Sequence, residues 1–300
     1  MIDWKGAYTI LLTAYTEDGG IDGDAMRSSV DFVIESGVHG VVALGSYGEN
    51  PYLRQDEKKE VFDTVIDQVN GRVPVIAGTG EVSTPMTKDL TRYALDAGAD
   101  ATMIALPVYW GLQEEDVIGH YLSVASAVDI PIFLYNIPSC THLELKPEIV
   151  ARLSEHENIV GIKESINDLE QIGAVLKTTT QPFYTFVGMS RLMLDVLKLG
   201  GRGCFDPVSN TLPEVIVGIY EAFKEGDLKK ADELQEKLVA HSAITRPGRP
   251  ANVAARKELM RLMGVPISSK VREPLPQLTD EQKRLIRENT EKAGLIDAAL

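Results

Sequence analysis

The sequence predicts a single (β/α)8 barrel with a C-terminal helical extension. From Tyr8 to Val208, short apolar and β-branched segments alternate with longer amphipathic segments, which is the pattern of repeated βα units in a parallel sheet. The alternation yields eight candidate strands, the number that closes a barrel of this type. The chain has 300 residues, of which 44% are hydrophobic, so it can fill a core of that size.

The eight candidate strands are brief and rich in Val, Ile, Leu or Ala. They are Tyr8–Thr13, Gly40–Leu44, Val73–Ala77, Ala101–Leu106, Pro131–Tyr135, Ile159–Lys163, Tyr184–Val187 and Gly203–Phe205. An open, doubly wound sheet is the alternative fold. It is disfavoured because the Gly-x-Gly-x-x-Gly fingerprint after a first strand is absent and because the units are evenly spaced.

Helices are predicted wherever apolar residues recur on one face. Within the repeats, the clearest stripes lie in Gln55–Val69 and Glu114–Ala127. After the eighth unit three further helices are expected, at Asp227–His241, Pro250–Met263 and Asp280–Lys292, separated by a turn at Arg246–Pro250 and an irregular segment at Val265–Thr279. We therefore expect a barrel over residues 1–225 and a helical bundle packed on it over residues 226–300.

The charge and the composition exclude several classes of function. The 30 Lys and Arg residues against 44 Asp and Glu residues give a net charge of −14, which disfavours binding to nucleic acid or to a membrane surface. The sequence shows no signal peptide and no apolar stretch of membrane-spanning length, so we expect a cytoplasmic protein. Two cysteines and five scattered histidines predict neither a disulfide framework nor a metal site.

Lys163 is the most informative single residue. Active sites of such barrels lie at the carboxyl ends of the strands, and Lys163 ends the apolar run Ile159–Ile162. Burial there disfavours the ammonium form, and a neutral amine is the form that attacks a ketone to make a Schiff base. The alternative interpretation is a structural lysine that reaches solvent or pairs with Glu164.

Two other strand ends supply hydroxyl groups. Tyr135 ends the fifth strand and Ser46 follows the second, and such groups can relay the protons that Schiff-base formation requires. Each has a structural alternative, a core aromatic for Tyr135 and a helix cap for Ser46. Gly45 and Gly48 favour a tight turn whose N–H groups face a carboxylate.

Three motifs, Gly45-Ser46-Tyr47-Gly48-Glu49, Tyr135-Asn136-Ile137-Pro138 and Gly161-Ile162-Lys163-Glu164, together resemble the dihydrodipicolinate synthase and N-acetylneuraminate lyase family. Their order and spacing match over nearly the whole chain, as does the segment Pro74–Gly80. Three ordered motifs are a far more specific signal than any one of them.

The resemblance implies a class I, metal-free aldolase or lyase that needs no cofactor and forms a homotetramer, a dimer of dimers. Lys163 then matches the lysine that binds pyruvate or another 2-oxo acid, and Tyr135 matches the general acid and base. Ser46 matches the relay hydroxyl, with Gly48 in the same turn near the substrate. Tyr109 matches a tyrosine that many members insert into the site of a neighbouring subunit.

Four departures from the family pattern concern the substrate. Cys140 stands where dihydrodipicolinate synthases carry the arginine that holds the carboxylate of the incoming aldehyde. Tyr47 replaces a threonine or serine that helps to hold the pyruvate carboxylate. Gly188 begins a segment without the acidic residue by which sialic acid lyases bind a sugar tail. Asp206 is a carboxylate where a small neutral residue is common, and we expect it to pair with Arg246 or Arg249 or to bind substrate hydroxyls.

The sequence thus predicts a Schiff-base lyase or aldolase that forms or cleaves a C–C bond next to a pyruvate unit. Three alternatives stay open. One is a dehydratase of 2-keto-3-deoxy sugar acids that uses the same lysine, and another is dihydrodipicolinate synthase itself. The third is a catalytically silent relative that only binds a 2-oxo acid.

Overall fold

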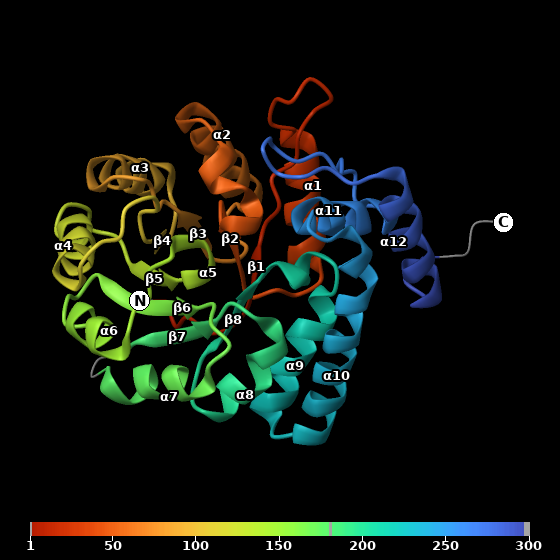
Figure 1. The fold of residues 1–300 in the computed structure, drawn as a ribbon. Helices are drawn as coiled ribbons and strands as arrows, with labels where there is room; N and C mark the ends of the chain where they lie inside the picture. Colours follow the sequence, from red (N-terminus) through yellow and green to blue (C-terminus); the bar gives the residue numbers. More distant parts are fainter. Residues whose placement is uncertain (1, 180–181, 297–300) are drawn as a thin grey trace.

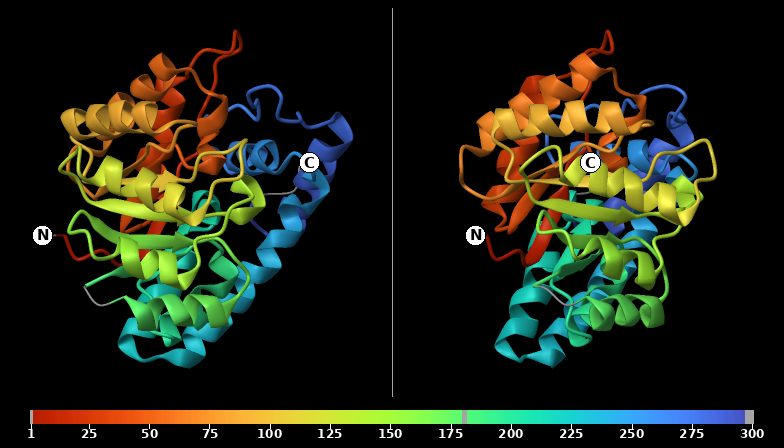
Figure 2. Two further views of the ribbon diagram at one scale, coloured as in Figure 1. Left: turned by 60° about the vertical axis from the view of Figure 1, so that its left-hand side comes forward. Right: turned by 90° about the vertical axis from the view of Figure 1, so that its left-hand side faces the viewer.

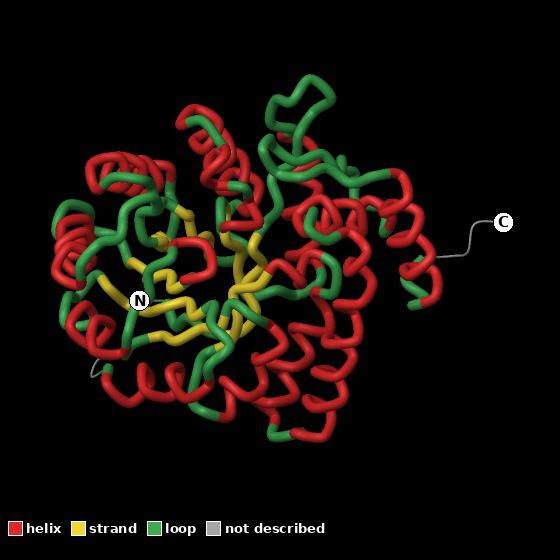
Figure 3. The backbone as a smooth tube through the Cα atoms, viewed as in Figure 1, coloured by secondary structure: helices red, strands yellow, loops and turns green. Residues whose placement is uncertain are grey.

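The computed structural model describes residues 2–179 and 182–296, and its centre is a closed barrel of parallel strands in sequence order, β1 to β8. Figures 1 and 3 show the strands at the centre of a ring of helices. The strands are β1 Gly6–Ile10, β2 Gly40–Ala43, β3 Val75–Gly78, β4 Ala101–Ala105, β5 Ile132–Asn136, β6 Ile159–Glu164, β7 Tyr184–Val187 and β8 Gly203–Asp206. The predicted (β/α)8 fold is confirmed.

All eight predicted strands are present, and the largest error in their bounds is at β1. The sequence predicted Tyr8–Thr13, whereas β1 ends at Ile10. Its partner β2 ends at Ala43, where Leu44 turns into the left-handed region at φ 61°. The Leu11 N–H still donates to Val42 O of β2 at 3.0 Å, and the residues after it leave the sheet although they remain buried as far as Tyr15.

The helices of the barrel are α1 Gly23–Glu35, α2 Gln55–Val69, α3 Thr84–Ala97, α4 Glu114–Ala125, α5 Pro138–Thr141, α6 Pro147–Leu153, α7 Leu169–Thr178, α8 Met193–Lys198 and α9 Pro213–Glu225. The prediction for α2 is confirmed to the residue, and α4 ends two residues earlier than predicted. Both begin with acidic residues in the first turn, which favour a helix N-terminus.

Aromatic side chains fill the interior of the barrel. The interior contains Trp4, Tyr8, Phe133, Phe186 and Phe205, each almost fully buried. They meet one another mainly in edge contacts, apart from a tilted Trp4–Tyr8 pair and a stacked Phe186–Phe205 pair at 4.1 Å. Rings of this size leave no open pore. The interior of the barrel is therefore packed with apolar side chains, and the residues at the carboxyl ends of the strands lie next to this core.

The C-terminal extension consists of α10 Leu228–Thr245, α11 Asn252–Leu262 and α12 Asp280–Lys292. Figure 1 and the left view of Figure 2 show these three helices together at one side of the barrel. The predicted bounds of α12 are confirmed, α10 is longer than predicted, and the segment between α11 and α12 is irregular as expected.

The extension shares a core with the barrel. Ala231 and Leu238 of α10 belong to the same apolar cluster as Ile219 and Ala222 of α9. The division into residues 1–225 and 226–300 stays a prediction, and positions 1, 180–181 and 297–300 of those ranges lie outside the described residues. Among the described residues, no helix has the length and hydrophobicity of a membrane span.

Candidate active site

Lys163 lies inside the carboxyl end of the barrel. Its neighbours in the strand register are Tyr135 on β5 and Phe186 on β7, both of which contribute to the apolar interior. Lys163 is 2% exposed, and its Nζ lies 3.9 Å from the centroid of the Tyr135 ring. The amine faces an aromatic ring and not a counter-ion.

The alternative in which Lys163 pairs with Glu164 is wrong. Successive residues of a strand point to opposite faces, so Glu164 lies in the layer between the strands and the helices. Its Oε2 accepts a hydrogen bond from Asn136 Nδ2 at 2.8 Å, while Oε1 is buried without a partner among the described residues. Burial raises the pKa of Glu164 to about 8, so the carboxyl group is largely protonated at neutral pH.

The second predicted hydroxyl meets Tyr135 directly. Ser46 Oγ lies 3.2 Å from Tyr135 Oη, within hydrogen-bonding distance. Ser46 opens a single 3-10 turn, Ser46–Gly48, immediately after β2. In the described part of the chain the N–H groups of Ser46 and Tyr47 have no acceptor, because they open the turn. The predicted pair of free N–H groups beside the hydroxyl is therefore present.

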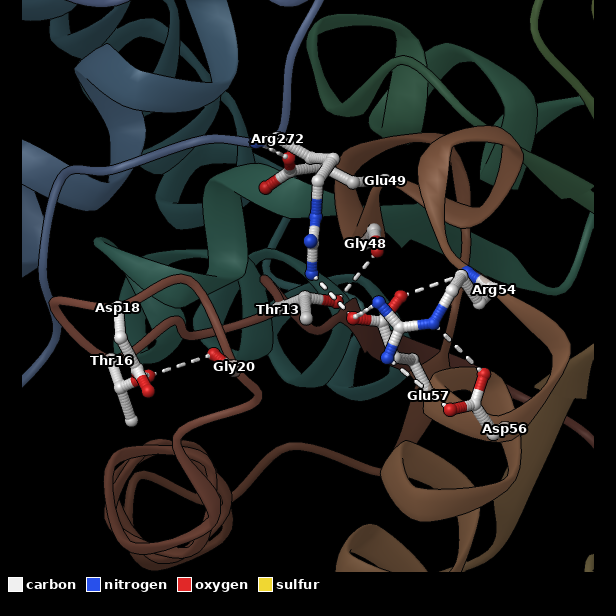
Figure 4. Close-up of polar contacts among 10 residues, drawn as sticks. All are labelled: Thr13, Thr16, Asp18, Gly20, Gly48, Glu49, Arg54, Asp56, Glu57 and Arg272. Carbon is white, nitrogen blue, oxygen red and sulfur yellow. Dashed lines mark hydrogen bonds and ion pairs between the residues drawn. The ribbon is translucent and has the colours of Figure 1, made fainter.

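Glu49 fixes this turn to the C-terminal extension. It adopts a left-handed conformation at φ 61°, and its carboxylate accepts hydrogen bonds from Lys257 Nζ at 2.5 Å and from the Arg272 N–H at 2.7 Å. Glu49 and Lys257 are both fully buried. Figure 4 shows Arg272 beside Glu49, with its side chain running on to Glu57, which it meets at 2.8 Å.

A cavity of about 140 Å³ opens beside the hydroxyl pair. Ser46, Tyr135 and Cys140 line it together with apolar residues of the strand ends. Lys58 also lines it, but this lysine is buried in an ion pair with Glu81, a second lining residue. Tyr135 lines this cavity, and its ring also contacts the Lys163 amine.

Gly188 has a clear geometric role. A Cβ atom at this position would lie 2.8 Å from Lys163 Cε and 2.0 Å from Ser165 Oγ. Both distances are shorter than real Cβ contacts, so any larger residue would displace the lysine side chain. The sequence singled out Gly188 as a substrate contact, whereas the structure shows how it leaves room for Lys163.

Asp206 does not pair with Arg246 or Arg249, and that expectation is wrong. Its two carboxylate oxygens accept hydrogen bonds from the backbone N–H groups of Ser190, at 2.7 Å, and Val208, at 2.6 Å. The bond from Ser190 joins the end of β7 to the end of β8. The two amide donors together satisfy the buried carboxylate without an arginine. A substrate contact of Asp206 stays a prediction.

Tyr109 lies apart from the other candidates. It is 91% exposed, with φ at 97°, and its ring meets that of Trp110 at 5.8 Å. In the described part of the chain it does not line the cavity that contains Ser46 and Tyr135. A contribution of Tyr109 to catalysis therefore requires a neighbouring subunit, and it stays a prediction.

No group of three or more His, Cys, Asp and Glu side chains within residues 2–179 and 182–296 is arranged to hold a metal ion. A buried lysine on a barrel strand beside two hydroxyl groups is compatible with carbon–carbon lyase chemistry, and the chain is a carbon–carbon lyase.

The comparisons with known proteins give the family. The model of the Dihydrodipicolinate synthetase family matches residues 3–293, and the chain belongs to this family. A relative from Methanopyrus kandleri, named 4-hydroxy-tetrahydrodipicolinate synthase, is 39% identical over 97% of both chains. A relative of the same name from Syntrophus aciditrophicus is 37% identical over 98% of this chain and 99% of its own.

Solved structures agree with this assignment. YagE, a prophage protein of the dihydrodipicolinic acid synthase family from E. coli K12 in complex with pyruvate, superimposes with a TM-score of 0.94. It is 30% identical, and the match covers 98% of this chain and 100% of YagE. The resemblance to the family that the three sequence motifs indicated is therefore confirmed.

The sequence did not predict the roles of several charged residues around the site. Glu49 stood in a quoted motif without a role, and its partner Lys257 lies 208 positions away. Nothing local in the sequence links the two. The Lys58–Glu81 pair was also missed, because both residues read as ordinary charged positions of a helix and a loop.

Proposed function

We propose that the chain is a Schiff-base-forming lyase or aldolase in which Lys163 binds a 2-oxo acid such as pyruvate. The observation that carries the proposal is the buried, unpaired Lys163 amine, set against Tyr135, whose hydroxyl group is within hydrogen-bonding distance of Ser46. A neutral amine in a water-poor site is a good nucleophile for a ketone. YagE, the structural relative solved with pyruvate, supports the choice of ligand.

In the proposed mechanism, Lys163 Nζ attacks the C2 ketone carbon of the substrate. Tyr135 Oη passes protons to the departing oxygen, which leaves as water, and Ser46 Oγ relays them onward. The resulting iminium withdraws electrons from the C3–C4 bond. Tyr135 Oη takes the proton of the C4 hydroxyl group as that bond breaks, which releases an aldehyde and leaves an enamine on Lys163. The enamine takes up a proton at C3, and water then frees pyruvate and the amine. The same steps in reverse give aldol addition.

The carboxylate of the 2-oxo acid fits the unpartnered N–H groups of Ser46 and Tyr47, because such donors bind anions without a charged side chain. In this proposal Tyr109 reaches the site of a neighbouring subunit in a homotetramer. Its high exposure and its absence from the described lining of the cavity beside Tyr135 support that arrangement.

Trapping tests the central step. The enzyme is incubated with pyruvate, reduced with borohydride and digested for mass spectrometry. We expect a mass increase on Lys163 and on no other lysine, including the buried Lys58 and Lys257. Lys163→Arg keeps a long nitrogen-bearing side chain but cannot form a Schiff base, so it should carry no adduct. Unmodified Lys163 in the wild-type enzyme would refute the proposal.

The proton relay has its own test. Tyr135→Phe keeps the ring over Lys163 but removes the hydroxyl group that meets Ser46. We expect the rate of adduct formation to fall about a hundredfold, the usual scale for loss of a general acid or base. A rate equal to that of the wild type would remove Tyr135 from the mechanism.

Dihydrodipicolinate synthase is the second candidate, favoured by the names of the curated relatives. Turnover of pyruvate with aspartate semialdehyde would identify it. A dehydratase would give one product from a deoxy sugar acid where a lyase gives two. A protein that only binds 2-oxo acids would form no product from any of these substrates.

A further inference from the structure

A second cavity, of about 300 Å³, adjoins the hydroxyl pair on the side of the C-terminal extension. Ser46 and Cys140 line both this cavity and the smaller one beside Tyr135, so the two are neighbours. In the described part of the chain Lys163 belongs to neither lining, but its amine contacts the Tyr135 ring, and Tyr135 Oη lies 3.2 Å from Ser46 Oγ. These contacts connect the second cavity to the amine.

The lining of the second cavity comes from two distant parts of the chain. One part is the turn after β2 together with α5, and the other is residues 250–254 together with residues of the segment between α11 and α12. The buried Glu49–Lys257 ion pair joins the turn to α11. The polar groups of the lining are few, namely the hydroxyl groups of Ser46, Tyr47 and Ser139, the Cys140 thiol and the Asn252 amide.

Arg249 directly precedes Pro250, the first lining residue of the extension. Its side chain is exposed and has no hydrogen-bond or ion-pair partner among the residues that the structure describes. Its backbone is held on both sides, because its N–H donates to Arg246 O at 3.2 Å and its carbonyl oxygen accepts from Gln282 Nε2 at 3.2 Å. A guanidinium on a fixed backbone, with its donors free, is available to a ligand.

The charges of two arginines reach Tyr47 of the lining. Burial raises the pKa of Tyr47, and the positive charges of Arg256 and Arg249 act against this rise. Arg256 is buried, donates to the neutral Thr211 Oγ1 at 3.0 Å, and has no described partner for its Nε. Because a guanidinium stays charged when it is buried, positive charge without an ion pair lies on this side of the cavity.

The carboxylates near the cavity do not occupy Arg249. Asp206 accepts hydrogen bonds from two backbone N–H groups, and Glu49 is held in its buried pair. Glu273, on the segment between α11 and α12, is exposed and would repel a second carboxylate. An anionic ligand is therefore favoured on the side of the cavity where Arg249 adjoins the lining.

We propose that Arg249 binds a carboxylate group on the aldehyde half of the substrate, in this cavity and beside the Tyr47 hydroxyl group. The inference rests on the proposed function. Cys140, in the same lining, stands where the family resemblance places a carboxylate-binding arginine. Arg249 thus supplies from the extension the planar, bidentate donor that Cys140 lacks.

The reaction places the charged end of the aldehyde away from the bond that forms. In the direction of synthesis, C3 of the Lys163-bound pyruvate enamine forms a bond to the aldehyde carbon, and the aldehyde oxygen takes up one proton from Tyr135 Oη. One water molecule, equal to the one lost on Schiff-base formation, then hydrolyses the iminium. The product is a 4-hydroxy-2-oxo acid whose second carboxylate is the one held by Arg249.

The test compares two aldehydes of equal chain length with pyruvate as the common partner. Succinate semialdehyde ends in a carboxylate, and butanal ends in a methyl group. Product is measured by mass spectrometry as a function of aldehyde concentration. We expect kcat/KM to be at least tenfold higher for succinate semialdehyde, because only its carboxylate forms a charge-assisted bond with Arg249. An equal or higher value for butanal would overturn the inference.

Substitutions of the arginine give a second readout, the ratio of kcat/KM for succinate semialdehyde to that for butanal. Arg249→Gln should lower this ratio at least tenfold, and Arg249→Lys, which keeps the charge, should lower it less. Arg246→Gln removes the same charge from the same turn, at an exposed residue that does not adjoin the described lining, and should leave the ratio unchanged. An unchanged ratio in Arg249→Gln, or a fall as large in Arg249→Lys or Arg246→Gln, would contradict the assignment of Arg249.

Borohydride trapping with pyruvate alone separates the two proposals. A Lys163 adduct with no turnover of either aldehyde refutes the role of Arg249 and leaves the Schiff base intact. The absence of an adduct refutes the proposed function, and the assignment of Arg249 falls with it.

Discussion

Glu164 gives the fold an unusual dependence on pH. Its carboxyl group is fully buried, receives one hydrogen bond from Asn136 and leaves one oxygen without a partner among the described residues. Burial raises its pKa from 4.5 to about 8 in the folded protein. The folded chain therefore keeps a proton that the unfolded chain releases between these two values.

The sign of the effect follows from this difference. Because the folded-state pKa lies above the unfolded value, the contribution to stability is fully present below pH 4.5 and is lost as the pH rises to 8. Each pH unit in this window lowers the free energy of unfolding by up to about 1.4 kcal/mol. Between pH 5 and pH 8 the loss is about 3 kcal/mol.

Glu164→Gln removes the titration while keeping the shape of the side chain. We expect the variant to lose about 3 kcal/mol less than the wild type between pH 5 and pH 8, measured by urea unfolding at one protein concentration. Glu157→Gln changes an exposed carboxylate in the turn before β6 and should follow the wild type. If Glu164→Gln and the wild type share one pH profile, Glu164 is not a buried neutral acid.

Two further predictions concern Lys163 and the buried ion pair between Lys257 and Glu49. Gly188→Ala places a Cβ atom against Lys163 Cε, so adduct formation with pyruvate should slow about a hundredfold, as expected for a displaced reacting group. Lys257→Met leaves the Glu49 carboxylate buried without its cation, so the free energy of unfolding should fall by about 3 to 5 kcal/mol in urea titrations.

The controls use positions where the same change meets no obstacle. Gly173→Ala on α7 adds a Cβ atom with no neighbour within 4 Å, and its adduct rate should equal that of the wild type. Lys229→Met breaks an exposed pair with Glu233 on α10 and should not change stability measurably. If Lys257→Met were as stable as Lys229→Met, the buried pair would not anchor the extension.

Much of the site was predictable because it follows the strands. Lys163, Tyr135 and Ser46 each end or follow a short apolar run, and the carboxyl ends of parallel strands meet at one end of a barrel. The direction of Lys163 also follows from alternation along β6, since its neighbour Glu164 must point to the other face.

The hydrogen-bond partners of Asp206 and Glu49 could not be predicted from strand ends or from alternation along a strand. Asp206 was expected to pair with an arginine, yet backbone N–H groups of the β7 and β8 ends satisfy it, because a local turn brings amide donors closer than any distant guanidinium. Glu49 needs a partner from α11, and the place of that helix depends on how the extension packs.

The sequence by itself determined the repeated units, the closed barrel and the lysine at the end of the sixth strand, since hydrophobic periodicity and strand-end position are local properties. Only the tertiary structure decided that the Tyr135 ring lies against the Lys163 amine, that Glu49 meets Lys257 across 208 positions, and that two cavities share Ser46 and Cys140 in their lining. These features depend on which distant surfaces come into contact, and side-chain packing between elements, not the pattern within any one of them, fixes that choice.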